Sequence, residues 1–313
     1  MEIVIDKKIA GKTVRTLLRQ DLGYSSAMLK KLKFSPGGIL VNGKFVTVRC
    51  ELREGDVLTL AVEDRDEDVS PYIIPVELEL PVLYEDDALT VVNKPPDMPS
   101  HPSFGHRDDT VANALAWRYR DRTYVFRPVN RLDRDTTGVM LTANTKLAAY
   151  RMFLAMQNGE IRKSYVAVAD GVPAEPQGRI EGFMRRVADS VIEREVCAEG
   201  APGAQSAVTQ YRVLAENGTH SVLLASPVTG RTHQIRVQLA SIGCPLCGDS
   251  LYGSASALIP RHALHAAYAA FPHPDGRTMT ARAPLPDDMT ALIGALFCGS
   301  AEKILEDIKN HLC

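Results

Sequence analysis

The sequence has no run of about 18 consecutive apolar residues, the length that a membrane-spanning helix needs. Its first residues, MEIVIDKKIAGK, lack the apolar core and the small-residue cleavage site of a signal peptide. We therefore expect a cytoplasmic protein with no membrane partner. Four catalytic signatures are also missing: GxxxxGK[ST], HExxH, GxSxG, and GxGxxG after a strand. Their absence argues against nucleotide hydrolysis and serine esterase chemistry.

Cysteines are few and scattered, six in 313 residues, which is typical of free thiols in a reducing compartment. Two of the cysteines and two histidines have the composition of a zinc site: Cys244 and Cys247 form C-x₂-C, and His262 and His265 form H-x₂-H after fourteen intervening residues. The histidine spacing is shorter than the usual three to five residues. We expect no metal and no cofactor, and metal analysis would test the alternative of a zinc protein with another role.

Charge is segregated along the chain, although the net charge is only −2. Residues 7–50 contain ten Lys or Arg and a single acid, Asp21, whereas residues 51–87 contain thirteen acids and two arginines. The basic segment is either a phosphate-binding surface or a solvated face that aids solubility. The acidic stretch EDRDED, residues 63–68, predicts a solvated linker.

The basic segment has the pattern of a small α/β unit. Residues 13–23 have apolar positions at helical spacing, and Ser25 or Ser26 could cap a second helix over residues 27–34. Asn42-Gly43 predicts a hairpin turn, and GDVLTLAV, residues 55–62, predicts a strand. We predict a first domain at residues 1–62, a linker at 63–72 and a larger domain at 73–313.

The larger region mixes strands and helices without a regular alternation, which predicts an α+β fold and not a doubly wound parallel sheet. Helices are predicted near residues 111–120, at 147–159 with Thr145 as the cap, and in the last fifteen residues. Strands are predicted on both sides of the turn at residues 85–87 and in three later segments. Those segments are 164–171, 206–226 and 229–240.

Chemistry-bearing residues gather in three segments. NRLDRDTTG, residues 130–138, is either a turn with local salt bridges or a loop in which guanidinium groups keep Asp133 ionised as a nucleophile or electrostatic stabiliser. The predicted strand over residues 161–171 places Lys163 and Tyr165 on one face, where a tyrosine usually belongs to the core. The third segment is TGRTHQIRVQLASIGCPLCGDSLYG, residues 229–253.

These segments resemble the RNA pseudouridine synthases of the large-ribosomal-subunit, RluA-like type. NRLDRDTTG is similar to the family signature HRLDRDTSG, with Asn130 and Thr137 in place of His and Ser. The resemblance implies that Asp133 is the catalytic carboxylate, that the Tyr165 ring stacks on the target base, and that Arg236 pairs with Asp133. VVNKPPDMPSHP at 91–102 and FPHP at 271–274 also resemble family motifs.

The same resemblance implies contacts with RNA. Residues 10–62 resemble the RNA-binding domain named from ribosomal protein S-four. The expected RNA-binding residues are Arg131, Arg134, Lys163, Arg231, His233, Gln234, Lys30, Lys31 and Lys33. A surface role is an equal alternative for Lys163. Contacts with the protein backbone are the alternative for Arg231, His233 and Gln234, and a satisfied core histidine is the favoured account of His233.

The implied fold is a largely antiparallel mixed sheet with flanking helices, preceded by the small RNA-binding domain. The implied activity is cofactor-free isomerisation of uridine in RNA, 23S-type ribosomal RNA or else tRNA, by a monomer. A non-catalytic RNA-binding or ribosome-assembly factor is the alternative, although the presence of Asp133, Tyr165 and Arg236 favours the enzyme. Attack by Asp133 on the sugar, attack on the base, and elimination at the ribose all remain open.

Overall fold

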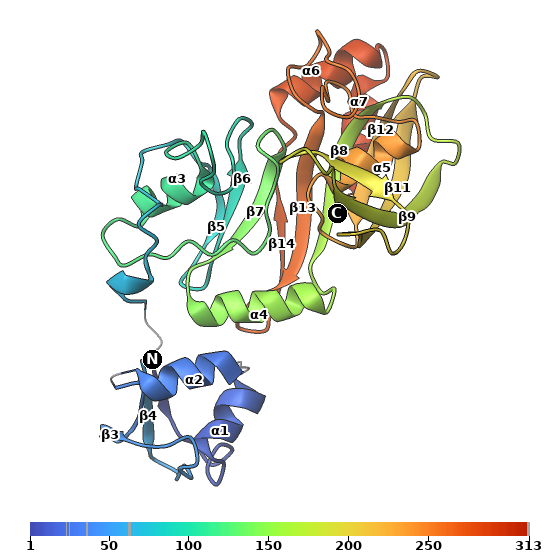
Figure 1. Ribbon diagram of the computed structural model, residues 1–313. Helices are drawn as coiled ribbons and strands as arrows, with labels where there is room; N and C mark the ends of the chain where they lie inside the picture. Colours follow the sequence, from blue (N-terminus) through green and yellow to red (C-terminus); the bar gives the residue numbers. More distant parts are fainter. Residues whose placement is uncertain (23, 25, 36, 62–63, 312–313) are drawn as a thin grey trace.

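The computed structural model describes residues 1–22, 24, 26–35, 37–61 and 64–311. Two sheets lie on either side of the acidic segment, one of four strands and one of ten (Figure 1). Within the described ranges, no helix has the length and apolar character needed to cross a membrane. The mixture of helices with a mostly antiparallel sheet confirms the predicted α+β class.

The smaller unit, drawn in blue in Figure 1, packs two helical segments on a sheet of strand order β1-β4-β2-β3. Asn42 and Gly43 both have positive φ, 50° and 75°, so the predicted hairpin turn is confirmed. Ser26 is the first residue of helix α2, while Ser25 lies outside the described residues. The elements are β1 (Glu2–Val4), α1 (Val14–Thr16), a π-helical turn (Leu17–Asp21), α2 (Ser26–Phe34), β2 (Ile39–Val41), β3 (Lys44–Phe45) and β4 (Val57–Leu60).

The larger sheet has the strand order β10-β9-β11-β12-β8-β13-β7-β6-β5, and β14 pairs with β13. Every pairing is antiparallel except that of β7 with β13. The sheet is therefore mixed but largely antiparallel, as predicted. Its strands are β5 (Val82–Glu85), β6 (Leu89–Lys94), β7 (Thr137–Ala143), β8 (Arg162–Asp170), β9 (Gln177–Arg186), β10 (Arg194–Cys197), β11 (Gln205–Glu216), β12 (His220–Pro227), β13 (Leu264–Pro272) and β14 (Thr278–Arg282).

Central strand β8 shows how the sheet carries a core on each face. Tyr165, Ala167 and Ala169 belong to the cluster that includes residues of helices α3 and α5, whereas Val166 and Val168 pack with residues of α6 and α7. Successive strand residues point to opposite faces, so the apolar run VAVA fills both cores. The helices are α3 (Val111–Arg118), α4 (Lys146–Gln157), α5 (Gln234–Ser241), α6 (Asp287–Leu296) and α7 (Ala301–His311).

Gly138 permits the single parallel pairing of the large sheet. It has a φ of 108°, and a Cβ added there would overlap the carbonyl group of Ala266 on β13. Residues other than glycine rarely adopt such a φ, and the backbones could not approach this closely with a side chain between them. The glycine that follows Thr137 thus lets β7 pair with β13 directly after the loop that holds Asp133.

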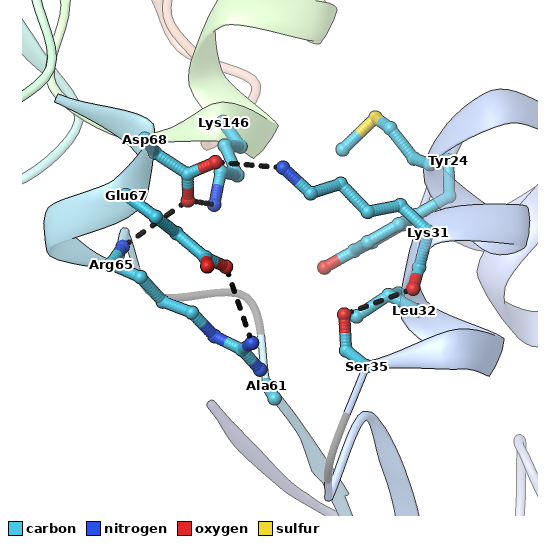
Figure 2. A pocket seen from close by; sticks show the side chains of 10 residues that line it. Tyr24, Lys31, Leu32, Ser35, Ala61, Arg65, Glu67, Asp68 and Lys146 are labelled. Carbon is cyan, nitrogen blue, oxygen red and sulfur yellow. Dashed lines mark hydrogen bonds and ion pairs between the residues drawn. The ribbon is translucent and has the colours of Figure 1, made fainter. Parts of the chain in front are cut away.

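The acidic segment differs from the solvated linker predicted for it. The carboxyl groups of Asp64 and Asp68 are only 10% and 15% exposed. Asp68 accepts hydrogen bonds from Lys31 of α2 and Lys146 of α4, both at 2.7 Å, as Figure 2 shows. Asp64 binds Arg127 through both carboxylate oxygens. These partners are distant in sequence, so the segment joins the two units through ion pairs.

Candidate active site

The loop before β7 holds Asp133 at the wall of a cleft of about 860 Å³. Asn130, at the position where the sequence departs from the family signature, accepts the Leu141 amide at 2.8 Å through Oδ1. Ser100 braces the loop from the other side: its hydroxyl donates to the Leu132 carbonyl and accepts the Leu132 amide. The loop is therefore held by neighbouring segments, while the Asp133 side chain stays 22% exposed.

Lys94 ties this loop to the end of strand β6. Its fully buried ammonium group donates hydrogen bonds to the carbonyls of Pro95, Met98 and Arg134 at 2.6 to 2.8 Å. Burial lowers the pKa of Lys94 to about 7, although the nearby carboxylates of Asp135 and Asp133 oppose the shift. The lysine of the motif VVNKPP thus serves as a brace between two loops.

The segment predicted as a strand over residues 229–240 is mainly a helix, α5, and this prediction was wrong. His233 occupies the N-cap position with a left-handed φ of 57°. The next six residues, 234–239, are all buried. Since no side of the helix faces solvent here, the order of apolar and polar residues shows neither the period of a helix nor that of a strand. The polar members are satisfied by the sheet: Gln238 donates to the carbonyls of Ile180 and Ala207.

Gln234 contacts the protein backbone in this arrangement, which is the alternative to an RNA contact for this residue. Its amide donates to the Val208 carbonyl and to the Thr209 hydroxyl, and its Oε1 accepts from Thr229 and from the Arg231 amide. All of its hydrogen-bonding groups are engaged within the protein, and only 4% of the residue is exposed.

Arg236 lies beside Asp133, but its bidentate partner is another carboxylate. Its Nε and Nη2 donate to Asp249 at 2.7 and 2.8 Å, whereas Nη1 reaches Asp133 Oδ2 at 3.4 Å. Arg236 thus pairs with Asp133 as expected, but through a single contact, and Asp249 is its bidentate partner. Burial alone would lower the pKa of Arg236, but the hydrogen bonds that it donates to Asp249 and the negative charges of Asp249 and Asp133 outweigh burial and raise the pKa. Asp249 fixes the guanidinium and leaves one N–H directed at Asp133.

The Tyr252 side chain contacts both Arg236 and His233. Its ring lies 5.0 Å from the Arg236 guanidinium, a cation–π contact, and its hydroxyl contacts Nδ1 of His233 at 2.8 Å. The other ring nitrogen of His233 is 3.9 Å from Asp133 Oδ2. Burial lowers the pKa of His233. Sequence reasoning did not single out Asp249 or Tyr252, although both lie in the matched segment GDSLYG.

Tyr165 and Lys163 both line the cleft from strand β8, which confirms that they share a face. The Tyr165 side chain is 7% exposed, and burial raises the pKa of its hydroxyl. Burial also lowers the pKa of Lys163. An aromatic ring and the Asp133 carboxylate thus line the same cleft.

Cations dominate the rim and walls of the cleft. Six of its lining residues are basic and one, Asp133, is acidic; the basic residues are Arg131, Arg134, Lys163, Arg194, Arg231 and Arg236. Arg194, from β10, was not predicted, because nothing in its local sequence sets it apart from other surface arginines. The concentration of positive charge favours a polyanion such as RNA.

Lys30, Lys31 and Lys33 lie elsewhere, on α2 of the smaller unit, and none lines this cleft. All three are exposed. Lys31 is the member of the set that pairs with Asp68 (Figure 2).

The four residues weighed as zinc ligands have separate partners. His262 Nε2 contacts the Thr136 hydroxyl, and His265 Nδ1 contacts the Thr137 hydroxyl, both at 2.8 Å. Burial lowers the pKa of both histidines to about 4. Cys244 is buried in the core, and Cys247 donates to Asp170. The five cysteines in the described ranges are free, as predicted, and Cys313 lies outside those ranges.

Comparisons with known proteins agree with this geometry. A family model described as RNA pseudouridylate synthase matches residues 88–241. The chain is 39% identical to an uncharacterized RNA pseudouridine synthase of Bacillus subtilis, YjbO, over 87% of this chain and 95% of that protein. It is 35% identical to ribosomal large subunit pseudouridine synthase D of Vibrio parahaemolyticus, over 97% and 96%. The solved human RNA pseudouridylate synthase domain containing 1 is 26% identical with a TM-score of 0.53, covering 70% of this chain and 95% of that one, which supports the predicted fold.

Proposed function

The chain belongs to the RNA pseudouridylate synthase family, and from this premise we propose that it isomerises specific uridines of large-subunit ribosomal RNA, with Asp133 as the catalytic carboxylate. The observation that supports this role is the position of Asp133 in a cationic cleft, beside Tyr165 and one N–H of Arg236. The name of the Vibrio relative, which acts on the large ribosomal subunit, supports the substrate class.

The reaction detaches uracil from its ribose at nitrogen 1, turns it, and rejoins it through carbon 5. Substrate and product contain the same atoms, so the net reaction consumes no oxidant and no energy source. A base inside a stacked helix cannot turn, and the nucleotide must first be flipped out at a cost of a few kcal/mol. In this proposal the Tyr165 ring, which lines the cleft, stacks on the flipped base, and such stacking contributes about 1–3 kcal/mol.

Each neighbour of Asp133 has a distinct part in this proposal. Arg236 offers one N–H at 3.4 Å, which contacts the carboxylate without enclosing it in a bidentate pair. The exposed Arg131, Arg134 and Arg231 are available to RNA phosphates. Asp133 can then attack the sugar or carbon 6 of the base, or drive elimination at the ribose, and the proposal covers each route.

We further propose that residues 1–62 form an S-four-like RNA-binding domain, that the boundaries 63–72 and 73–313 hold as predicted, and that the protein acts as a cytoplasmic monomer. Exposed Lys30 and Lys33 on α2 support phosphate binding by the smaller unit. Such contacts release counterions, so affinity for RNA should fall steeply as salt rises. A titration in which affinity does not change with salt would contradict this part of the proposal.

The experiment that tests the proposed activity is a pseudouridine map. Unmodified ribosomal RNA and tRNA are incubated with the wild type, with Asp133→Asn and with Asp97→Asn, and new sites are located by carbodiimide labelling and primer extension. Asp97 is 83% exposed and serves as the matched control for loss of one acid. New sites in large-subunit RNA with the wild type and Asp97→Asn alone support the proposal.

The other outcomes are equally informative. Sites in tRNA alone would keep the chemistry and change the substrate. Turnover by Asp133→Asn, with RNA binding retained, would remove Asp133 from the catalytic role. Tight binding to every RNA without product from any variant would favour the non-catalytic assembly factor.

A further inference from the structure

Three side chains of the types that bind zinc meet at the end of β8 that lies away from the cleft. Asp170 ends β8, His220 begins β12, and Cys247 lies in the segment after α5. Asp170 and His220 face each other across the two strands. One oxygen, one nitrogen and the sulfur of the three residues lie within 4.8 Å of one another.

Backbone hydrogen bonds hold Cys247 and Asp170, and the pairing of β12 with β8 holds His220. The Cys247 amide donates to the Val168 carbonyl, and its own carbonyl accepts the Ala263 amide, both at 2.9 Å. The Asp170 amide donates to the Pro245 carbonyl at 2.8 Å. The three donor atoms therefore come from a preformed arrangement, and they would need little movement to bind an ion.

The orientation of His220 suits a metal ligand. Its Nδ1 lies 2.9 Å from the Thr219 hydroxyl, while Nε2 faces Asp170 Oδ1 at 3.5 Å. A histidine that binds metal through one ring nitrogen commonly has the other held by such an outer partner. Cys247 Sγ lies 2.8 Å from Asp170 Oδ1. Zinc bonds of about 2.0–2.3 Å place ligand atoms roughly 3–4 Å apart, so shifts of less than about 1 Å suffice.

The cluster is separate from the machinery around Asp133. Asp170 lies five residues beyond Tyr165 on β8, roughly 16 Å at the usual rise of a strand. The side chains of Asp170 and His220 are 40% and 29% exposed, which leaves an open side for solvent. Burial, together with the hydrogen bond to Asp170, raises the pKa of the Cys247 thiol, so an ion must displace its proton.

We propose that Asp170, His220 and Cys247 form a binding site for a borderline-soft divalent cation such as Zn²⁺, with water as the fourth ligand. Thiolate and imidazole favour such ions over Mg²⁺ or Ca²⁺. The thiol proton leaves to solvent as the sulfur–metal bond forms. Cys247, one of the residues weighed as a zinc ligand from its spacing, thus has Asp170 and His220 as co-ligands in place of Cys244, His262 and His265.

Occupancy of this site would cross-link β8, β12 and the segment that leads to Asp249. Cys247 precedes Asp249 by two residues, and Asp249 holds the Arg236 guanidinium. The ion would act on stability, and the inference holds whether or not the chain isomerises uridine.

The test uses the full chain, stripped with a chelator and titrated with Co²⁺, whose bond to a thiolate gives a charge-transfer band in the near ultraviolet. We expect one equivalent of Co²⁺ to produce the band and Zn²⁺ to abolish it. Cys247→Ala should lose the band, and His220→Ala should bind at least about tenfold more weakly, since even outer contacts of metal sites contribute that much. Cys298→Ser, which changes an exposed cysteine, is the matched control.

Absence of the band in the wild type at millimolar Co²⁺, or its loss in Cys298→Ser, would overturn the site. Unchanged affinity in His220→Ala would do the same. Circular dichroism checks folding, and if Cys247→Ala does not fold, thermal unfolding decides the question. Zn²⁺ should then raise the melting temperature of the wild type and not that of His220→Ala.

Discussion

Asp249→Asn is the substitution that most directly tests how the site is built. Asp249 is 1% exposed and binds the 8% exposed Arg236 side chain through two hydrogen bonds. Asparagine keeps the size of the side chain but removes the charge, and it turns an N–H toward one N–H of the guanidinium. Removing one partner of a buried ion pair costs about 3–5 kcal/mol, because the remaining charge stays buried without compensation.

We expect Asp249→Asn to lower the free energy of unfolding by about this amount and to lower kcat more than it raises KM. Arg236 would lose its fixed position and turn toward Asp133, the other carboxylate that it contacts. Urea unfolding monitored by circular dichroism measures the first effect. Turnover on the mapped RNA measures the second.

Asp288→Asn is a matched control. Asp288 also binds a buried arginine, Arg261, through both oxygens, but its side chain is 30% exposed and solvent can compensate for part of the loss. A loss in Asp249→Asn no larger than that in Asp288→Asn would refute the argument. The pair Asp249→Leu with Arg236→Met should recover much of the stability without activity, since apolar replacements of buried ion pairs are often neutral.

Two further predictions concern the joint between β7 and β13. His265 has its pKa lowered to about 4 by burial, so the unfolded chain takes up a proton below about pH 6.5 that the folded chain does not. The contribution of His265 to the free energy of unfolding should therefore fall by about 3 kcal/mol between pH 7 and pH 4, and urea unfolding of His265→Asn should lack this component of the slope. Gly138→Ala should lower the free energy of unfolding by about 3 kcal/mol or more, because Gly138 has a φ of 108° and an added Cβ would overlap the Ala266 carbonyl. Gly276→Ala is the control: its φ of 98° is also strained, but the space around it is open, so the loss should be smaller. Equal losses in the two glycine variants, measured by thermal unfolding, would show that close packing at Gly138 is unimportant.

Local signals in the sequence predicted local structure well. The pair Asn42-Gly43 requires a tight hairpin, and Thr145 caps α4 by accepting the Ala148 amide, as predicted. These features depend on residues close in sequence, so propensity and spacing suffice to identify them. The strand that carries Tyr165 and Lys163 was predicted for the same reason.

Contacts between residues that are distant in the sequence could not be predicted from the sequence alone. The helix α5 was mistaken for a strand because its buried polar residues, such as Gln238, find carbonyl partners on β9 and β11. Arg236 contacts two carboxylates, that of Asp133, 103 residues before it, and that of Asp249, 13 residues after it. Only the fold determines which of them binds the guanidinium through two hydrogen bonds. Asp64 and Asp68 looked solvated because their partners Arg127 and Lys146 lie more than sixty residues away.

The parallel pairing of β7 with β13 rests on two residue pairs, His265 with Thr137 and Ala266 with Gly138, whereas the ladders beside it, β6 with β7 and β8 with β13, have six each. Backbone pairing therefore contributes less to this joint than to its neighbours, and the buried side chains of β7 and β13 that pack together contribute the rest. Asp133 is carried by the β7 half and Tyr165 by the β8 half. The distance between the Asp133 carboxylate and the Tyr165 ring therefore depends on how the two halves of the sheet pack across this one joint.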